Sequence, residues 1–268
     1  MSDDSPQPDL TIAPAWAARL RALTPARVGL ARTGASLETS DLLDFQRCHA
    51  QARDAVHSRL EADTLAAALA RISGLEVLRL HSAAPDRTTY LQRPDLGRKL
   101  DEASRNLLAY RALHEPSGDL PDKEPKLALI VADGLSSLAV ERHAVPLLSE
   151  LLPRLDAWQL APLCVVQQAR VAIGDEIGQA LGAQISVVLI GERPGLSSPD
   201  SLGAYITWQP KPGRTDAERN CISNIRAEGL SYTQAAAQLS YYLTEARRKQ
   251  LTGVALKQEA HKLKEGQA

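Results

Sequence analysis

From Leu127 to Trp208, short apolar runs alternate with segments of helix length, and this alternation limits the fold more than any other feature of the chain. The strand-like runs are 127–134, 161–167, 185–191 and 204–208, and the helix-like segments between them are 136–152 and 173–181. Strands that alternate with helices form parallel crossover units with right-handed connections. We therefore predict an α/β, Rossmann-like layered domain with a mostly parallel sheet over residues 85–268.

The residues before this domain have a different pattern. Residues 1–14 hold three prolines and an acidic cluster, and we expect them to form a mobile tail. We expect residues 15–84 to form a small N-terminal helical lobe. Its longest segment, 39–72, has cap candidates at its start and apolar residues at helical spacing. These are Thr39 or Ser40 as caps, and Leu42, Phe45, Ala52, Val56 and Leu60 as the apolar stripe.

The overall composition argues against several classes of partner. The 31 basic and 32 acidic residues nearly cancel, so no net charge favours nucleic acid or an anionic membrane. No run approaches the roughly 18 apolar residues of a membrane span, and the start "MSDDSPQPD" has no signal-peptide pattern. Three cysteines without a CxxC pair fit a reducing compartment. We therefore expect a cytoplasmic protein that contacts neither nucleic acid nor membrane.

The predicted sheet also indicates where a ligand would bind. In parallel α/β sheets, ligands bind beyond the carboxyl ends of the strands, where the loops from several strands converge. Four loops are expected to lie together at this end of the sheet: "ADGLSS", "QQARVAIGD", "GERPGLSS" and "QPKPGRTD". The segment "AERNCISN" follows closely enough to reach the same place.

The residues of these loops allow several roles. Ser136 could cap the helix after "ADG", or act with Asp133 as a catalytic hydroxyl. Glu192 could pair with Arg193 or Arg170 at a solvated edge, or accept hydrogen bonds from amide donors.

Cys221 could be a small buried apolar residue, a thiol donor or a reactive group. His57 is more consistent with a surface position on a helix than with a ligand role, because "DAVH" is not the DxHxxG of proteins that bind cobalamin through histidine. The motifs GxGxxG, GxxxxGK[ST], HExxH and GxSxG are absent from the sequence.

An ordered series of segments resembles the small subunit of ethanolamine ammonia-lyase. The series covers roughly residues 27 to 255 and is more specific than any single motif. It consists of "RVGLARTGASLETSDLLDFQRCHAQARDAVH", "YLQRPDLGRKL", "VADGLSS", "ARVAIGDEIGQALGA", "VVLIGERPGLSSPDSLGAYITWQP" and "RNCISNIRAEGLSYTQAAAQL".

The resemblance implies a lyase that converts ethanolamine to acetaldehyde and ammonia with adenosylcobalamin. It implies a large subunit that carries the substrate pocket, and a small subunit that covers part of the cofactor at the interface and is inactive alone. The family's cofactor contacts in this subunit correspond to Val171, Glu192 and Cys221. Because the cofactor supplies the radical chemistry, no residue of this chain is expected to be catalytic or to bind a metal.

About 26 residues precede the match, whereas similar family members have a longer extension that can direct the enzyme into a bacterial microcompartment. Residues 15–23 could form a short amphipathic helix. A microcompartment is therefore an alternative to a free cytoplasmic location. Two alternatives from other functional classes are a free-standing α/β enzyme that acts on a small nucleotide, and a structural assembly subunit without cofactor contact.

Overall fold

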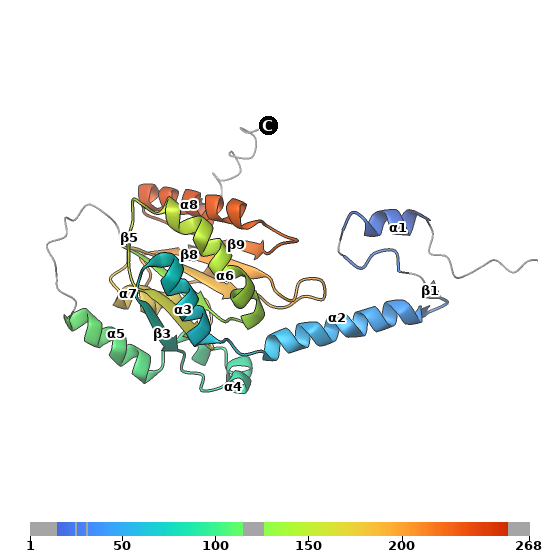
Figure 1. Cartoon of the computed structure of the whole chain (residues 1–268), viewed down its shortest axis with the longest axis horizontal. Helices are drawn as coiled ribbons and strands as arrows, with labels where there is room; N and C mark the ends of the chain where they lie inside the picture. Colours follow the sequence, from blue (N-terminus) through green and yellow to red (C-terminus); the bar gives the residue numbers. More distant parts are fainter. Residues whose placement is uncertain (1–14, 25, 31, 115–125, 257–268) are drawn as a thin grey trace, which may run out of the picture.

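The centre of the molecule is a mixed β-sheet with helices on both faces (Figure 1). The computed structural model describes residues 15–24, 26–30, 32–114 and 126–256. Within these residues the sheet has seven strands, in the order β3-β6-β4-β7-β8-β9 with β5 beside β4. The strands are β3 (Val77–His81), β4 (Lys126–Ala132), β5 (Gln159–Leu160), β6 (Leu163–Gln167), β7 (Ile185–Gly191), β8 (Leu202–Trp208) and β9 (Arg219–Ile225).

Each face of this sheet has its own apolar core. One face packs against α3 (Ala62–Ser73), α6 (Ser137–Leu151) and α8 (Tyr232–Lys249). The other face packs against α5 (Glu102–His114) and α7 (Ile173–Ala180). Every residue of β7 is buried, which explains why its sequence is apolar except for Ser186, since a strand covered on both faces has no solvent side. The α/β fold with a mostly parallel sheet is thus confirmed, and the closer likeness to the Rossmann arrangement stays a prediction.

Strand direction changes at one edge of the sheet. β3, β6, β4 and β7 pair in parallel, whereas β8 runs antiparallel to β7, and β9 antiparallel to β8. Because Trp208 pairs with Ile185, β8 ends beside the start of β7. The loop "QPKPGRTD" therefore lies beside the amino ends of the parallel strands, opposite to the other three loops. Its predicted place among the ligand-binding loops is wrong.

The N-terminal region does not pack as the apolar pattern suggested. Instead of one long helical segment, it contains α2 (Thr39–His57) and, after a break, α3. Leu42 and Phe45, which belong to the predicted stripe, are exposed. The expected side-chain cap is also absent, because Glu38 holds the N-cap position without a side-chain hydrogen bond. A stripe at helical spacing is buried only where a second surface covers it.

Instead, α2 extends away from the sheet and carries α1 (Ala15–Arg21) and the short hairpin β1–β2 (Arg32–Thr33 and Ser36–Leu37) near its far end (Figure 1). We call residues 15–57 the N-terminal arm. The sheet begins before residue 85, since β3 pairs with β6 and α3 packs on the sheet, so the expected domain boundary does not coincide with the start of the sheet. The expected mobile tail, residues 1–14, lies outside the described residues.

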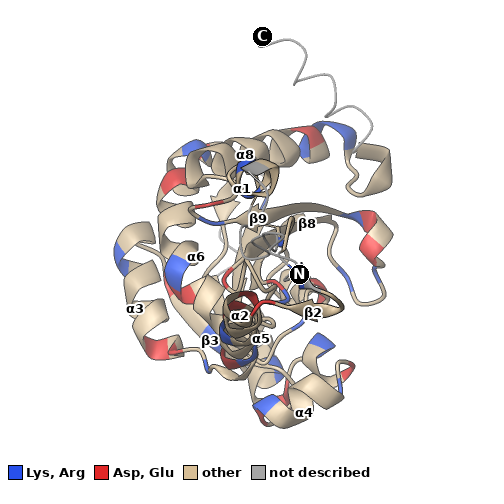
Figure 2. Cartoon of the chain, turned by 90° about the vertical axis from the view of Figure 1, so that its right-hand side faces the viewer, with Lys and Arg blue, Asp and Glu red and all other residues tan. Residues whose placement is uncertain are grey.

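Short elements complete the described chain: α4 (Arg87–Gln92), η1 (Leu96–Arg98), η2 (Leu152–Arg154) and η3 (Asp216–Glu218). Among the described helices, none has both the length and the apolar character that crossing a membrane requires. Figure 2 views the side from which the arm projects, where basic and acidic residues are interspersed over the helices and loops.

Candidate functional site

A cavity of about 460 Å³ opens at the carboxyl ends of the parallel strands β4, β6 and β7. Its wall combines apolar, aromatic and charged side chains, as small-molecule sites commonly do. The lining residues are Tyr90, Gly134, Leu135, Arg170, Val171, Ile190, Gly191, Glu192, Arg193 and Tyr205. Two of the three residues that the family resemblance implied as cofactor contacts, Val171 and Glu192, are therefore in the wall of this cavity.

Two glycines allow the loops above the strands to approach each other closely. Gly134 has a φ of 61°, and a Cβ atom there would lie 2.2 Å from the carbonyl oxygen of Gly191. A Cβ atom at Gly191 would lie 1.9 Å from the carbonyl oxygen of Ser136. Because no other residue fits either position without displacement of the backbone, these glycines set the shape of this wall.

Ser136, for which a cap and a catalytic role were both open, is the N-cap of α6. Its Oγ accepts a hydrogen bond from the backbone N–H of Ala139 at 3.3 Å and donates to the carbonyl oxygen of Pro199 at 2.8 Å. The side chain is fully buried. These contacts identify a structural cap, because the hydroxyl is used on both sides and faces no solvent.

Glu192 follows β7 directly and is held by neutral donors. Its backbone N–H donates to the carbonyl oxygen of Ser201 at 2.9 Å, and its carboxylate accepts hydrogen bonds from the Ser201 hydroxyl and, at 3.2 Å, from the backbone N–H of Asn224. No ion pair joins Glu192 to Arg170 or Arg193 in the described part of the chain. The carboxylate is thus fixed in direction while its negative charge stays available.

Val171 lies in the loop between β6 and α7, and buried polar contacts fix the backbone just before it. The Asp133 carboxylate accepts hydrogen bonds from the backbone N–H groups of Gln168 at 2.8 Å and Ala169 at 3.0 Å. Gln168 has a φ of 55°, a left-handed conformation that needs such support in a residue other than glycine. As a result, Val171 is held in the cavity wall.

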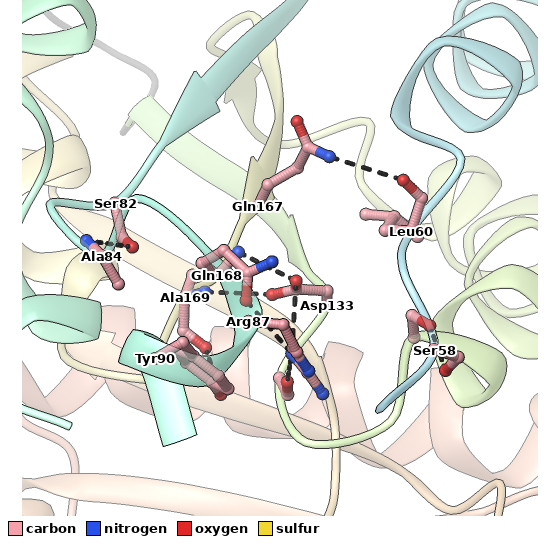
Figure 3. A network of polar contacts seen from close by, with 12 residues as sticks. Ser58, Leu60, Ser82, Ala84, Arg87, Tyr90, Asp133, Gln167, Gln168 and Ala169 are labelled. Carbon is pink, nitrogen blue, oxygen red and sulfur yellow. Dashed lines mark hydrogen bonds and ion pairs between the residues drawn. The ribbon is translucent and has the colours of Figure 1, made fainter. Parts of the chain in front are cut away.

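Arg87 joins this buried network to other elements (Figure 3). Its guanidinium lies 3.5 Å from the Asp133 carboxylate and donates to the carbonyl oxygens of Gly134 at 2.8 Å and Val56 at 2.7 Å. Burial raises the pKa of the Asp133 carboxyl, an effect opposed by its two backbone donors and by Arg87. One arginine thus connects the last turn of α2, α4 and a loop of the cavity wall.

Cys221 lies on β9, outside the lining residues but next to them. It is exposed, and its Sγ is 3.3 Å from the Ser223 hydroxyl. Its register partner on β8 is Tyr205, which lines the cavity, so both side chains extend from the same face of the sheet. Burial, together with the neighbouring Cys221 and Glu192, raises the pKa of the Tyr205 phenol.

Three cavity residues lie outside the loops that were expected at this end of the sheet: Tyr90, Ile190 and Tyr205. Arg170 lies in the expected loop "QQARVAIGD", but the sequence indicated it only as a possible ion-pair partner of Glu192. Tyr90 comes from α4, which lies before the strand–helix alternation, and only the tertiary structure brings it to the site. His57, in contrast, is exposed at the end of α2, which agrees with its surface interpretation.

In the described part of the chain, no group of three or more His, Cys, Asp or Glu side chains could hold a metal ion. The fold and the cavity define an α/β protein with a cavity beyond the carboxyl ends of its parallel strands, the place where proteins of this class bind ligands. Comparison with known proteins gives the family: the model of the ethanolamine ammonia-lyase light chain (EutC) matches residues 14–257. The chain therefore belongs to the family of ethanolamine ammonia-lyase light chains.

Individual relatives agree with this assignment. The chain is 57% identical to the ethanolamine ammonia-lyase small subunit of Pseudomonas syringae pv. tomato over 90% of this chain and 82% of the relative. It is 56% identical to the small subunit of the same name from Azotobacter vinelandii over 97% of this chain and 93% of the relative. The corresponding subunit of Xanthomonas campestris pv. campestris is 57% identical over 92% of this chain and 88% of the relative.

Proposed function

We propose that this chain is the small subunit of an adenosylcobalamin-dependent ethanolamine ammonia-lyase, and that it covers and orients the cofactor at the interface with a catalytic large subunit. The observation that carries the proposal is the clustering of the expected contacts. Val171 and Glu192 line one cavity, and Cys221 extends from the sheet beside Tyr205 of the same cavity.

The residues of the cavity fit the periphery of a corrinoid. A corrin ring carries amide side chains whose N–H groups need acceptors once water is removed, and Glu192 offers a fixed carboxylate. Val171 and Ile190 supply apolar surface for the hydrocarbon parts of the ring. When bound, the cofactor supplies radical chemistry through cleavage of its cobalt–carbon bond. The residues of this chain bind and orient the cofactor and transfer no proton.

The size of the cavity supports a role shared with a partner chain. The volume of a cobalamin with its nucleotide is larger than the about 460 Å³ of this cavity, so only part of the cofactor can enter the cavity. The remaining surface then needs a second protein surface to exclude water. The relatives are named small subunits, which implies a larger partner. We therefore expect the isolated chain to release no ammonia from ethanolamine.

The N-terminal arm is the second surface that we assign to the large subunit. It carries seven of the twelve large apolar side chains that are exposed in the described part of the chain: Trp16, Leu20, Leu23, Leu37, Leu42, Leu43 and Phe45. The arm projects from the side of the molecule where the loop between β7 and β8 lies (Figure 1). A single partner can therefore cover both the arm and the cavity. Such clustered apolar exposure is typical of interaction surfaces.

Replacement of Glu192 tests cofactor binding. Glu192→Ala removes an acceptor that carries a charge, and a hydrogen bond to a charged group contributes about 1.5–3 kcal/mol, so the half-saturating cofactor concentration should rise about ten- to a hundredfold. Glu192→Gln should give an intermediate value because it keeps one acceptor oxygen. The measurement is a titration of the complex with the large subunit by adenosylcobalamin under excess ethanolamine.

Glu102→Ala, at an exposed position in the first turn of α5, is the matched control and should leave cofactor saturation unchanged. Unaltered saturation in the Glu192→Ala complex would contradict the proposal. In that case the alternative of an assembly subunit without cofactor contact would be favoured.

We propose a cytoplasmic location for the enzyme, with a microcompartment as the alternative. Fractionation of cells grown on ethanolamine distinguishes the two.

A further inference from the structure

The cavity wall contains more positive than negative charge. Arg170 and Arg193 both line it, whereas Glu192 is the one carboxylate among its lining residues. The Glu192 carboxylate is bonded to Ser201 and Asn224. Among the residues that the structure describes, no carboxylate forms an ion pair with either arginine. The wall can therefore accept an anionic group as well as amide donors.

Arg170 is held more firmly than an ordinary surface arginine. Its backbone N–H donates to the carbonyl oxygen of Gly97 at 2.7 Å, and its guanidinium lies over the ring of Tyr90, 4.3 Å from the centroid. Gly97 leaves room for the stem, since a Cβ atom there would lie 3.0 Å from Cγ of Arg170. This packing limits the rotamers of Arg170 and lowers the entropic cost of binding.

Part of the Arg170 guanidinium has no satisfactory partner. Its Nε is buried without a hydrogen bond, and its Nη2 reaches only the carbonyl oxygen of Tyr90 at 3.5 Å. Arg87 also lies over Tyr90, at 4.8 Å, but it has the nearby Asp133 carboxylate at 3.5 Å. The charge of Arg170 is therefore the one beside Tyr90 that no acidic side chain balances.

We propose that Arg170 binds a phosphate group, namely the phosphodiester of the nucleotide arm of cobalamin. This inference rests on the proposed function. The peripheral amides of the corrin are neutral, whereas the phosphodiester carries the negative charge that a planar guanidinium binds through paired N–H donors. Arg193 lines the same cavity but is exposed, and it contributes mainly to the general positive potential.

The test compares two corrinoids that differ in this group. Cyanocobalamin contains the phosphodiester, and cobinamide lacks the whole nucleotide arm. Both are titrated by equilibrium dialysis against the complex with the large subunit, with the native chain and with Arg170→Gln. We expect Arg170→Gln to weaken cyanocobalamin binding about ten- to a hundredfold, and cobinamide binding by about twofold at most. Cobinamide thus controls for any change in the shape of the cavity.

Arg193→Gln removes the same charge from the same cavity and should weaken cyanocobalamin binding by about threefold at most. Equal losses for both corrinoids on Arg170→Gln would overturn the assignment, because they would mean that Arg170 supports the ring or the wall. The thermal midpoint of both complexes is also measured with and without inorganic phosphate. If Arg170→Gln leaves the binding of both corrinoids unchanged and abolishes only a stabilisation by inorganic phosphate, the site binds free phosphate and the assignment is overturned. A native complex that binds neither corrinoid would contradict the proposed function itself.

Discussion

Side chains around the cavity differ in how firmly the chain holds them. Glu192 is fixed by two donors and Arg170 by a ring, a backbone contact and a glycine. Cys221 is exposed and is held by weak contacts of its thiol, with the Ser223 hydroxyl and with the Tyr205 phenol. At the scale of single residues, we therefore expect Glu192 and Arg170 to contribute most to cofactor binding and Cys221 to contribute less.

Replacement of Cys221 measures its smaller contribution. Because the side chain is exposed, Cys221→Ala should leave the fold and the thermal midpoint unchanged. It removes a weak S–H contact, so cobalamin affinity of the complex should fall about two- to tenfold. Cys221→Asp adds a negative charge near Glu192 and should weaken binding further. Thr244→Asp, an exposed position on α8 at the opposite face of the sheet, should have no effect. Unchanged affinity in Cys221→Asp would exclude a cofactor contact there.

Several elements meet at the buried Arg87. This side chain, in the first turn of α4, bonds to the last turn of α2 through Val56 and to the cavity wall through Gly134. Its Nη2 is buried without a hydrogen-bond partner, so the geometry is already incomplete. At the scale of elements, the position of the N-terminal arm is therefore connected to the shape of the cavity through one side chain.

Arg87→Ala should lower the free energy of unfolding by about 3 kcal/mol, because it leaves the buried Asp133 carboxylate without its cation. Thermal or urea unfolding measures the loss. Adding Asp133→Asn to the same chain should restore part of it, since the uncompensated charge is then removed. Arg93→Ala, which breaks the exposed pair with Asp95 just after α4, is the control and should not shift the unfolding midpoint. A shift of equal size in the control would refute the role of the buried pair.

At the scale of the whole molecule, the described residues form a layered α/β body and a projecting arm with many exposed apolar side chains (Figure 1). Such a surface is costly in water unless another protein covers it. Because the arm and the cavity lie on the same side, assembly and cofactor binding are expected to depend on one interface. Figure 2 looks onto this side.

Leu43→Asp tests the arm as an assembly surface. Leu43 is 59% exposed, so the change should not affect folding of the isolated chain. Burying a leucine contributes about 1.5–3 kcal/mol, so affinity for the large subunit should fall at least about tenfold in titration calorimetry. Leu113→Asp, at an 81% exposed position on α5 at the far end of the body, is the matched control. Equal affinities for the two variants would show that the arm is not part of the interface.

The local sequence was sufficient for several elements of the body, among them β4, β6, β7 and α6, but not for β9. Apolar runs such as β7 are buried on both faces and read as strands without further information. A serine before a helix is a cap candidate, and the structure confirms this role at Ser136 but not at Thr39 or Ser40 of α2. The quoted segments also determined the family, because their order over most of the chain is specific. They placed Glu192 at the end of a strand, where α/β proteins bind ligands.

Only the tertiary structure decided strand direction, the packing of the arm and the full cavity wall. The direction of β8 depends on the end of the sheet at which the chain enters this strand after β7. A strand has the same apolar pattern in either direction, so that pattern does not reveal the direction. The stripe of α2 could not reveal whether a partner surface within the chain covers it. Tyr90 and Arg170 meet although they are 80 positions apart, because contacts between distant segments depend on the packing of the whole fold rather than on local propensity.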